Sequence, residues 1–220
     1  MTIEFLSNIP VNQVYARDCE ADDIIGYVTK NMFKEDEIII ASSDKDFYQL
    51  LEADRIKQYS PATKKIITES DVLDQYNITV ENFVTARALI GDPSDGIAGI
   101  KGCGFKTLAK RFPELSETGF VSVNDIINKS NKLCEGKSLK LYKSISESPD
   151  LLKRNWDLMY LDIKHLSAYQ IKKIDEMVSN KDLPRDKLNL LKSMVKHGVN
   201  LPKAIDIDKF YTIINANIKK

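Results

Sequence analysis

The chain has 220 residues, of which 43% are hydrophobic and 29% charged, and its formal net charge is zero. This composition is typical of a globular protein, and no stretch approaches the roughly 18–20 uninterrupted apolar residues of a membrane helix. The three cysteines and two histidines are too isolated for a disulfide framework or a zinc site, and they favour a reducing cytoplasm.

The charge is unevenly distributed along the chain. From Met1 to Asp54 four basic residues stand against twelve acidic ones, whereas Lys101 to Arg111 contains four basic residues and no acidic one. From residue 112 onward, nineteen basic residues outnumber fourteen acidic ones. A single charged run is usually a solvated surface. The whole arrangement suits an enzyme that gathers cations in one place and phosphates in another.

The first third of the chain predicts an α/β layer. Ala21 to Phe33 has apolar residues at helical spacing, and Glu37 to Ser42 is a β-branched run typical of a buried parallel strand. Asp46 to Leu51 predicts a short helix. Arg55 to Tyr59 and Lys64 to Thr68 alternate around a turn and predict a hairpin. The alternation of helix and strand indicates a fold with a parallel sheet.

The rest of the chain predicts helices. Thr79 is a candidate N-cap for a helix that runs to Leu89 or Ile90, and a glycine-rich stretch separates it from a helix over Lys106 to Phe112. Amphipathic patterns follow from Val123 to Lys220. Examples of these patterns are Ile171 to Val178 and Leu188 to Val195, with Pro184 and Pro202 expected between helices.

Three groups of carboxylates lie at the ends of predicted elements. In chain order they are Glu20, Asp22 and Asp23; Asp44 and Asp46; and Asp92 and Asp95. In open α/β sheets, ligands collect outside the carboxyl ends of strands, which is where the second group is expected. Taken singly, each group has a simpler explanation as a helix cap, a partner of a helix dipole or an ordinary turn.

Together the carboxylates predict a metal centre. Clustered without cations, they would repel one another by several kcal/mol. Oxygen ligands without histidine or thiolate favour Mg²⁺ or Mn²⁺ over zinc. Two such ions can activate a water and stabilise the leaving oxygen when a phosphodiester is hydrolysed.

The stretch from Gly99 to Lys106, G-I-K-G-C-G-F-K, has the pattern of a helix–hairpin–helix. Glycines let backbone N–H groups approach a phosphate, and the following helix adds its dipole and basic side chains. The candidate DNA-backbone contacts are Gly99, Lys101, Gly102, Gly104, Lys106, Lys110 and Arg111. A turn that only joins two helices is the simpler alternative. A dinucleotide fingerprint is disfavoured because a helix, rather than a strand, precedes the motif.

Read together, four motifs resemble the 5′-nuclease family of flap endonucleases, polymerase I nuclease domains and bacteriophage exonucleases also called ribonuclease H. The motifs are E-A-D-D from Glu20, S-S-D-K-D-F from Ser42, G-D-P-S-D from Gly91 and G-I-K-G-C-G-F-K from Gly99. Their order and spacing match the family from Ile3 to Pro113. The segment that begins at Gln58 and the helical tail are most similar to the phage members.

The resemblance implies a PIN-like α/β nuclease core over residues 1–78 and a helical domain over 79–220 that contains a helix–three-turn–helix element. It implies 5′→3′ exonuclease or flap-endonuclease activity on DNA or RNA–DNA hybrids, with removal of flaps or RNA primers by a two-metal mechanism. The implied catalytic residues are Glu20, Asp22, Asp44, Asp46 and Asp92, with Asp23 and Asp95 as further metal ligands. Glu20 and Asp22 would serve the first ion, and Asp46, Asp92 and Asp95 the second, with Asp44 between them. The hairpin would grip the duplex and hold K⁺ through backbone carbonyls.

One departure from the family pattern concerns the N-terminus. The family begins with a strand that bears a metal-binding Asp in a V-D-G-x-N-like context, followed by a second ligating Asp and a helical arch with catalytic cations. Here Met1 falls in the helix before an expected strand over Val11 to Ala16. We therefore expect a complementary N-terminal nuclease polypeptide as a partner, and partly uncovered apolar faces on Ile38 to Ile40 and on the helix from Ala21.

Two alternative functions remain open from the sequence. A DNA-binding remnant would keep the hairpin and hydrolyse nothing, but it would not require the carboxylates. A phosphoacceptor domain would also place acidic pairs near a strand end, but it would not require the hairpin or the Gly91 to Asp95 motif.

Overall fold

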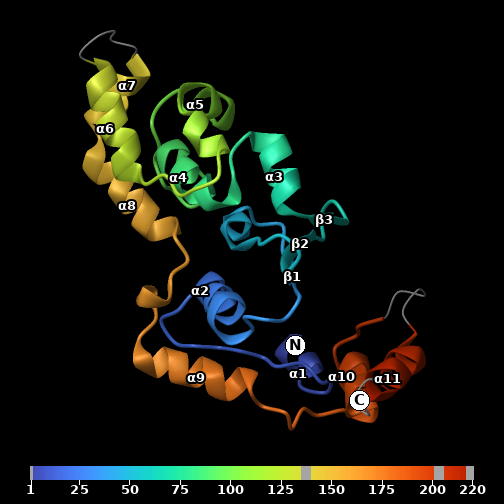
Figure 1. Ribbon diagram of the computed structural model, residues 1–220. Helices are drawn as coiled ribbons and strands as arrows, with labels where there is room; N and C mark the ends of the chain where they lie inside the picture. Colours follow the sequence, from blue (N-terminus) through green and yellow to red (C-terminus); the bar gives the residue numbers. More distant parts are fainter. Residues whose placement is uncertain (1, 135–139, 201–205, 217–220) are drawn as a thin grey trace. The chain divides into compact units, whose positions relative to one another are not determined.

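The computed structural model describes residues 2–134, 140–200 and 206–216, and Figure 1 shows its elements. The chain forms two compact units, one of Met1–Ile24 with Leu166–Lys220 and the other of Ile25–His165. The predicted domain boundary between residues 78 and 79 lies inside the second unit and stays a prediction. Pro202 lies outside the described residues. Among the residues described, no helix has the length and apolar character needed to cross a membrane.

The second unit begins within helix α2 and contains a small sheet followed by helices. Its elements are α2 (Ala21–Tyr27), the π-helix η1 (Val28–Met32), β1 (Ile38–Ala41), the 3₁₀ helix η2 (Asp46–Leu50), β2 (Ile56–Ser60), β3 (Lys65–Ile67), α3 (Glu69–Tyr76), α4 (Val80–Ile90), α5 (Phe105–Arg111), η3 (Pro113–Ser116), α6 (Val123–Cys134), α7 (Lys140–Ser146), α8 (Pro149–Met159) and η4 (Ile163–His165). The helix predicted over Ala21 to Phe33 is therefore present as α2 and η1, and the helix predicted after the glycines is present as α5.

The sheet has the order β1-β2-β3 and is mixed. β1 pairs parallel with β2, with Ile40 opposite Gln58, and β2 pairs antiparallel with β3, with Gln58 opposite Ile67. This confirms the predicted strand and hairpin. The other edge of β1 has no strand partner among the described residues.

One side of β1 faces a small apolar core. Ile40 is buried with Phe47, Leu50 and Ile56, whereas Ile39 on the opposite face is 63% exposed. The alternation follows from the two-residue period of a strand, which sends successive side chains to opposite faces. Of the three strand residues expected to be partly uncovered, Ile39 is therefore exposed, Ile38 is half-buried and Ile40 is buried.

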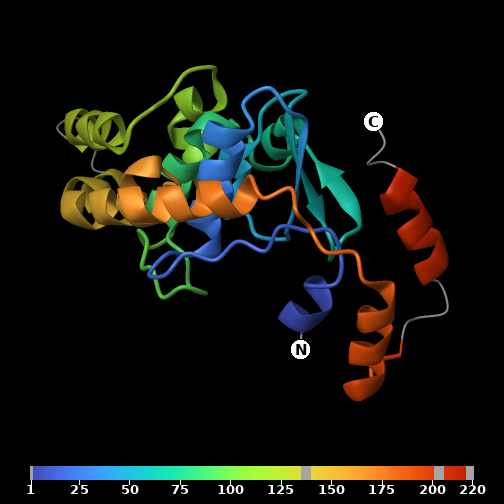
Figure 2. The same ribbon diagram turned by 90° about the horizontal axis from the view of Figure 1, so that it is seen from below.

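Helix α4 is the centre of the larger core. Eight of its eleven residues are buried, and it packs against α8, η2, α5 and α3. Phe112, Ile126 and Leu152, from three different parts of the chain, complete the same cluster. Helices α6 and α8 lie side by side in both views (Figures 1 and 2). Helix α4 is therefore packed both against η2, which follows β1, and against the later helix α8.

Helix α3 was not predicted. Its signal is a capping box in which the Thr68 hydroxyl accepts from the backbone N–H of Asp71, while the Asp71 carboxylate accepts from the backbone N–H of Thr68. The sequence T-x-x-D marks such a helix start. Thr79 precedes α4 as expected, but its hydroxyl accepts a hydrogen bond from the Asn82 side chain and makes no cap bond to the helix backbone.

The first unit contains α1 (Thr2–Leu6), α9 (Ala168–Val178), α10 (Lys187–Lys196) and α11 (Ile207–Ala216). The predicted patterns at Ile171 and Leu188 correspond to α9 and α10, and Pro184 lies between these helices as expected. In α1, Glu4 pairs with Lys196 and His197 at the end of α10. This acidic side chain ties the N-terminal helix to α10.

The strand predicted over Val11 to Ala16 was wrong. These described residues have no regular secondary structure. The backbone N–H of Val11 donates to the Ile9 carbonyl, and that of Tyr15 to the Met177 sulfur. A strand requires a neighbouring strand to satisfy its backbone groups, and here those bonds go to a turn and to a side chain instead.

Candidate metal and DNA-binding site

The loop after β1 positions Asp44 and Asp46. The Asp44 Oδ1 accepts from the Asp46 backbone N–H at 2.9 Å, and the Ser42 hydroxyl oxygen accepts from the Asp44 N–H at 3.1 Å. Asp44 is exposed and Asp46 is half-buried at the start of η2. These hydrogen bonds order the loop that carries both carboxylates.

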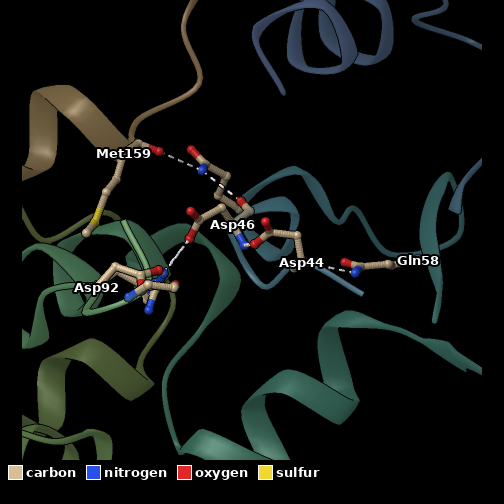
Figure 3. Close-up of polar contacts among 8 residues, drawn as sticks. Asp44, Asp46, Gln58, Asp92 and Met159 are labelled. Atoms are coloured by element: carbon tan, nitrogen blue, oxygen red, sulfur yellow. Dashed lines mark hydrogen bonds and ion pairs between the residues drawn. The ribbon is translucent and has the colours of Figure 1, made fainter. Parts of the chain in front are cut away.

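Two glutamine side chains form hydrogen bonds with the backbone of this loop. Gln58 on β2 is fully buried, and its Nε2 donates to the carbonyls of Ser42 at 2.8 Å and Asp44 at 2.7 Å. Gln49 Nε2 donates to the carbonyls of Asp46 at 2.8 Å and Met159 at 2.9 Å. Figure 3 shows the contact of Gln58 with the Asp44 segment, with Asp46 lying between Asp44 and Asp92. These bonds fix the backbone that carries the two carboxylates.

The turn after α4 brings the third carboxylate group to the second. One carboxylate oxygen from each of Asp46, Asp92 and Asp95 lies within 4.8 Å of the other two. Asp92 is buried and Asp95 is exposed. Asp92 Oδ1 accepts from the backbone N–H of Ser94 at 2.9 Å and from its hydroxyl, and Asp92 is bridged through its backbone to Ile97. The turn is therefore ordered by its own hydrogen bonds.

Arg87 of α4 joins two of these carboxylates. Its Nε and Nη2 donate to Asp46 Oδ1 at 3.1 and 3.0 Å, and its Nη2 also donates to Asp92 Oδ2. The Arg87 side chain is only 11% exposed. A buried guanidinium between carboxylates is strongly hydrogen-bonded, because burial of an unpaired charge is costly.

The protonation properties of the group follow from burial and these partners. Burial raises the pKa of Asp46, with the neighbouring charges of Asp44 and Asp92 adding to the effect against the lowering by Arg87. Burial also opposes ionisation of Asp92, but hydrogen bonds from Ser94 and Arg87 outweigh it and lower its pKa to about 2. Like charges held this close are characteristic of a site that receives a cation.

The donor set fits a hard divalent cation. All three groups offer carboxylate oxygens, with no nitrogen or sulfur ligand among them. The Asp95 carboxylate has no hydrogen bond or ion pair to the described residues. Such oxygen-rich sets suit Mg²⁺ or Mn²⁺. Asp46, Asp92 and Asp95 are therefore able to hold an ion.

The remaining carboxylates, Glu20, Asp22 and Asp23, lie at the start of α2. Glu20 is exposed, and Asp22 and Asp23 are half-buried in the first turn of the helix. The Asp23 Oδ2 accepts from the Glu20 backbone N–H at 3.4 Å, which is a local contact at the helix start. These residues belong to the first compact unit, and their role as metal ligands stays a prediction.

Two glycines join the Asp92 turn to the hairpin by close backbone contact. A Cβ on Gly99 would lie 1.9 Å from the Ile90 carbonyl oxygen, and one on Gly91 would lie 2.4 Å from the Gly99 nitrogen. Gly91 also has a positive φ of 80°. Only glycine permits both the approach and the dihedral. Asn155 of α8 also connects α4 to this turn, since its Nδ2 donates to the carbonyls of Ala88 and Ala98.

The hairpin presents one basic side chain, Lys101, and α5 presents three more. Lys101, Lys106 and Lys110 are exposed and Arg111 is half-buried, while Leu108 and Ala109 on the other face of α5 are buried. Gly102 has a positive φ of 77° and open space around it. Gly104 precedes α5 as its N-cap residue, with open space at its Cβ position. The two lysines of this helix thus face solvent.

Four side chains that organise the site were not predicted: Gln49, Gln58, Arg87 and Ser94. For two of them the sequence carries a signal. Arg87 is the only cation in a helix whose other residues are largely buried, and Gln58 occupies an inward position of β2 between Ile56 and Ser60. Charged and amide side chains are rarely buried without a partner. Their partners, however, are distant in sequence and become evident only in the fold.

Comparisons with known proteins connect this site to nucleases. Residues 1–77 match a family profile described as the 5′-3′ exonuclease N-terminal resolvase-like domain. A 5′-3′ exonuclease of Mycoplasmopsis pulmonis is 30% identical over 149 residues, which cover 63% of this chain and 49% of the relative. A thermostable DNA polymerase I of Thermus thermophilus is 40% identical over 96 residues, covering 43% of this chain and 11% of the relative. The chain spans about half the length of the first of these relatives, and less of the second.

Solved structures of 5′-nucleases also match this chain. A mutant of the T5 5′-exonuclease matches with a TM-score of 0.62 and 27% identity, covering 74% of this chain and 65% of that one. A bacteriophage T5 flap endonuclease, in a pseudo-enzyme–product complex with DNA and metal ions, matches with a TM-score of 0.61 and 26% identity over 74% of this chain and 58% of that one. The profile, the relatives and the solved structures thus agree that the chain is similar to proteins of the 5′-nuclease family.

Proposed function

We propose that this chain carries the metal-binding and DNA-binding part of a 5′→3′ exonuclease or flap endonuclease. The observation that carries the proposal is the convergence of Asp46, Asp92 and Asp95 within 4.8 Å of one another. The substrate is DNA with a 5′ end or flap, or an RNA–DNA hybrid such as a primer. The reaction is hydrolysis of a phosphodiester bond, and the site of action is the cytoplasm, or the host cytoplasm for a viral protein.

In this proposal two Mg²⁺ or Mn²⁺ ions are held by the seven carboxylates. Asp46, Asp92 and Asp95 hold one ion, Glu20 and Asp22 with Asp23 hold the other, and Asp44 lies between them. When bound, the ions supply an activated water and stabilise the leaving oxygen. The residues of the chain orient these ligands: Gln58 and Gln49 fix the Asp44–Asp46 backbone, and Ser94 fixes Asp92.

The hairpin and α5 form the DNA-binding part of the proposal. We assign them to a helix–hairpin–helix whose backbone N–H groups and lysines contact phosphates without reading sequence. The close packing of Gly91 on Gly99 supports this assignment, because it fixes the distance from the carboxylate turn to the hairpin. Backbone carbonyls of the same hairpin are the proposed site for K⁺.

The free edge of β1 supports a nuclease polypeptide as a partner. Ile39 is exposed and β1 pairs only with β2 among the described strands, so a further parallel strand can extend a PIN-like core. We propose that a polypeptide with an Asp-bearing strand and a cationic arch pairs there. In the same proposal, residues 1–78 belong to the nuclease core and 79–220 to the helical domain.

The test is cleavage of a 5′-labelled flap duplex with Mg²⁺ or with EDTA. We expect the chain alone to bind the duplex weakly and cut it barely, and an added N-terminal nuclease fragment with the V-D-G-x-N strand to restore Mg²⁺-dependent cleavage. Asp92→Asn in the same mixture is the control for the site. Binding without cleavage under every fragment and metal condition would favour a DNA-binding remnant and overturn the proposed hydrolysis.

A further inference from the structure

Arg87 is a cation inside the carboxylate group. It lies on α4, a helix whose neighbouring positions Ala86, Ala88 and Leu89 are fully buried, and its own side chain is 11% exposed. Desolvation on this scale disfavours a charged side chain unless partners compensate. The ion pairs with Asp46 and Asp92 therefore compensate the cost of burying the Arg87 charge.

The contacts divide the carboxylate oxygens unequally. Arg87 donates hydrogen bonds to Oδ1 of Asp46 and Oδ2 of Asp92, and Ser94 donates to Oδ1 of Asp92. Oδ2 of Asp46 and both oxygens of Asp95 have no hydrogen-bond partner among the described residues. One positive and three negative side chains leave a charge of −2 at this group. A single divalent cation neutralises that charge.

We propose that Arg87 is a positioning residue that holds Asp46 and Asp92 together before metal binds and restrains the affinity of the group for divalent cations. This inference rests on the proposed function, in which the same carboxylates are metal ligands. A planar guanidinium reaches two carboxylates at once, which a compact ammonium does not do equally well. The positive charge of Arg87 also repels a metal ion that approaches the same carboxylate oxygens.

Two properties follow, and they can be separated by substitution. Arg87→Met removes both the bridge and the charge, so the metal-free protein should be less stable and should bind Mn²⁺ at least about tenfold more tightly. Arg87→Lys keeps the charge but weakens the bridge, so stability without metal should fall while the affinity for Mn²⁺ should change less than about threefold.

The matched control is Arg55, another mostly buried arginine in the same unit. It pairs with Glu52 at 2.6 Å and donates to the carbonyls of Thr29 and Phe33, away from the carboxylate group. Arg55→Met should lower stability equally with EDTA and with Mn²⁺ and should leave Mn²⁺ affinity unchanged. A general effect of removing a buried arginine would appear in both variants.

The experiment measures Mn²⁺ binding to the full chain by electron paramagnetic resonance and thermal unfolding in EDTA and in Mn²⁺. Tighter Mn²⁺ binding by Arg87→Met, with a larger stabilisation by Mn²⁺ than in the unsubstituted chain, is the expected result. If Arg87→Met does not fold in EDTA, the test rests on Arg87→Lys, which should be less stable in EDTA and should change its Mn²⁺ affinity by less than about threefold. Unchanged or weaker Mn²⁺ binding by Arg87→Met, or wild-type stability of Arg87→Lys in EDTA, would overturn the role of Arg87.

Asp95→Asn separates this inference from the proposed function. It should reduce Mn²⁺ binding relative to the unsubstituted chain, because Asp95 offers unpaired ligand oxygens. If it does so while Arg87→Met has no effect on affinity, the metal site stands and the role of Arg87 is overturned. If Asp95→Asn leaves Mn²⁺ binding intact, the metal assignment fails and this inference fails with it.

Discussion

The two compact units hold their acidic side chains in different ways. In Ile25–His165, Asp46 and Asp92 are bound by a buried arginine, by Ser94 and by a backbone that two glutamines fix. In the other unit, Glu20 is exposed, and Asp23 makes a local contact with the helix start. The first arrangement persists without metal because its partners belong to the chain.

The largest expected effect of this difference is at Asp92. Asp92→Asn should lower Mg²⁺-dependent cleavage by the complemented chain on the order of 10³-fold, because it removes a proposed ligand. It should also lower the free energy of unfolding by about 2 kcal/mol, since the buried Arg87 loses one of its two charged partners and keeps only Asp46. Glu20→Gln should reduce cleavage as well but change stability by less than about 0.5 kcal/mol. Cleavage rates and urea unfolding measure the two effects, and equal decreases in stability would contradict the comparison.

A second effect concerns the glycine contact in the same unit. Gly99→Ala should lower the free energy of unfolding by about 3 kcal/mol or more, because its Cβ would overlap the Ile90 carbonyl. Gly104→Ala is the matched control: nothing lies near its Cβ position, and its φ of −139° is open to any residue. Urea unfolding measures the stability of both variants. Similar free energies of unfolding would contradict the close backbone contact between the turn and the hairpin.

The hairpin lysines give a smaller effect, on DNA affinity. Lys106→Ala with Lys110→Ala should weaken duplex binding and reduce the log–log salt slope by about 0.9 for each phosphate that the substituted side chains no longer neutralise. Lys181→Ala with Lys192→Ala, two exposed lysines of the other unit, should leave the slope unchanged. Fluorescence anisotropy across a salt series measures both pairs. The reverse pattern would place the duplex on the unit without the hairpin.

The smallest effect is in the unit of Met1–Ile24 and Leu166–Lys220. Hydrogen bonds from His197 and Lys196 lower the pKa of Glu4 to about 2. A depressed carboxyl pKa stabilises the fold above the ordinary pKa of 4.5, and that contribution disappears as the pH falls toward 2. Glu4→Gln should therefore flatten the decrease in stability between these pH values. Unfolding of α1 and α10, followed by hydrogen exchange at several pH values, checks this; an unaltered profile would show that the pair contributes nothing.

The sequence predicted most of the elements because their signals are local. The β-branched run at Ile38, the turn around Pro61 and the glycines before α5 each determine their structure within a few residues. The strand over Val11 to Ala16 was wrong because a strand depends on a partner that is not encoded nearby. Among the site residues, the acidic motifs were visible, but the role of Arg87 depends on Asp46, which is 41 positions away.

The central claim is that Asp46, Asp92 and Asp95 form a divalent-metal site, and a crystal grown with Mn²⁺ tests it directly. The anomalous difference map should show an ion about 2.0–2.6 Å from oxygens of these carboxylates. In the same map for Asp95→Asn, the peak should be absent or strongly weakened. Mn²⁺ bound elsewhere in the chain, with no ion at these three carboxylates, would contradict the account.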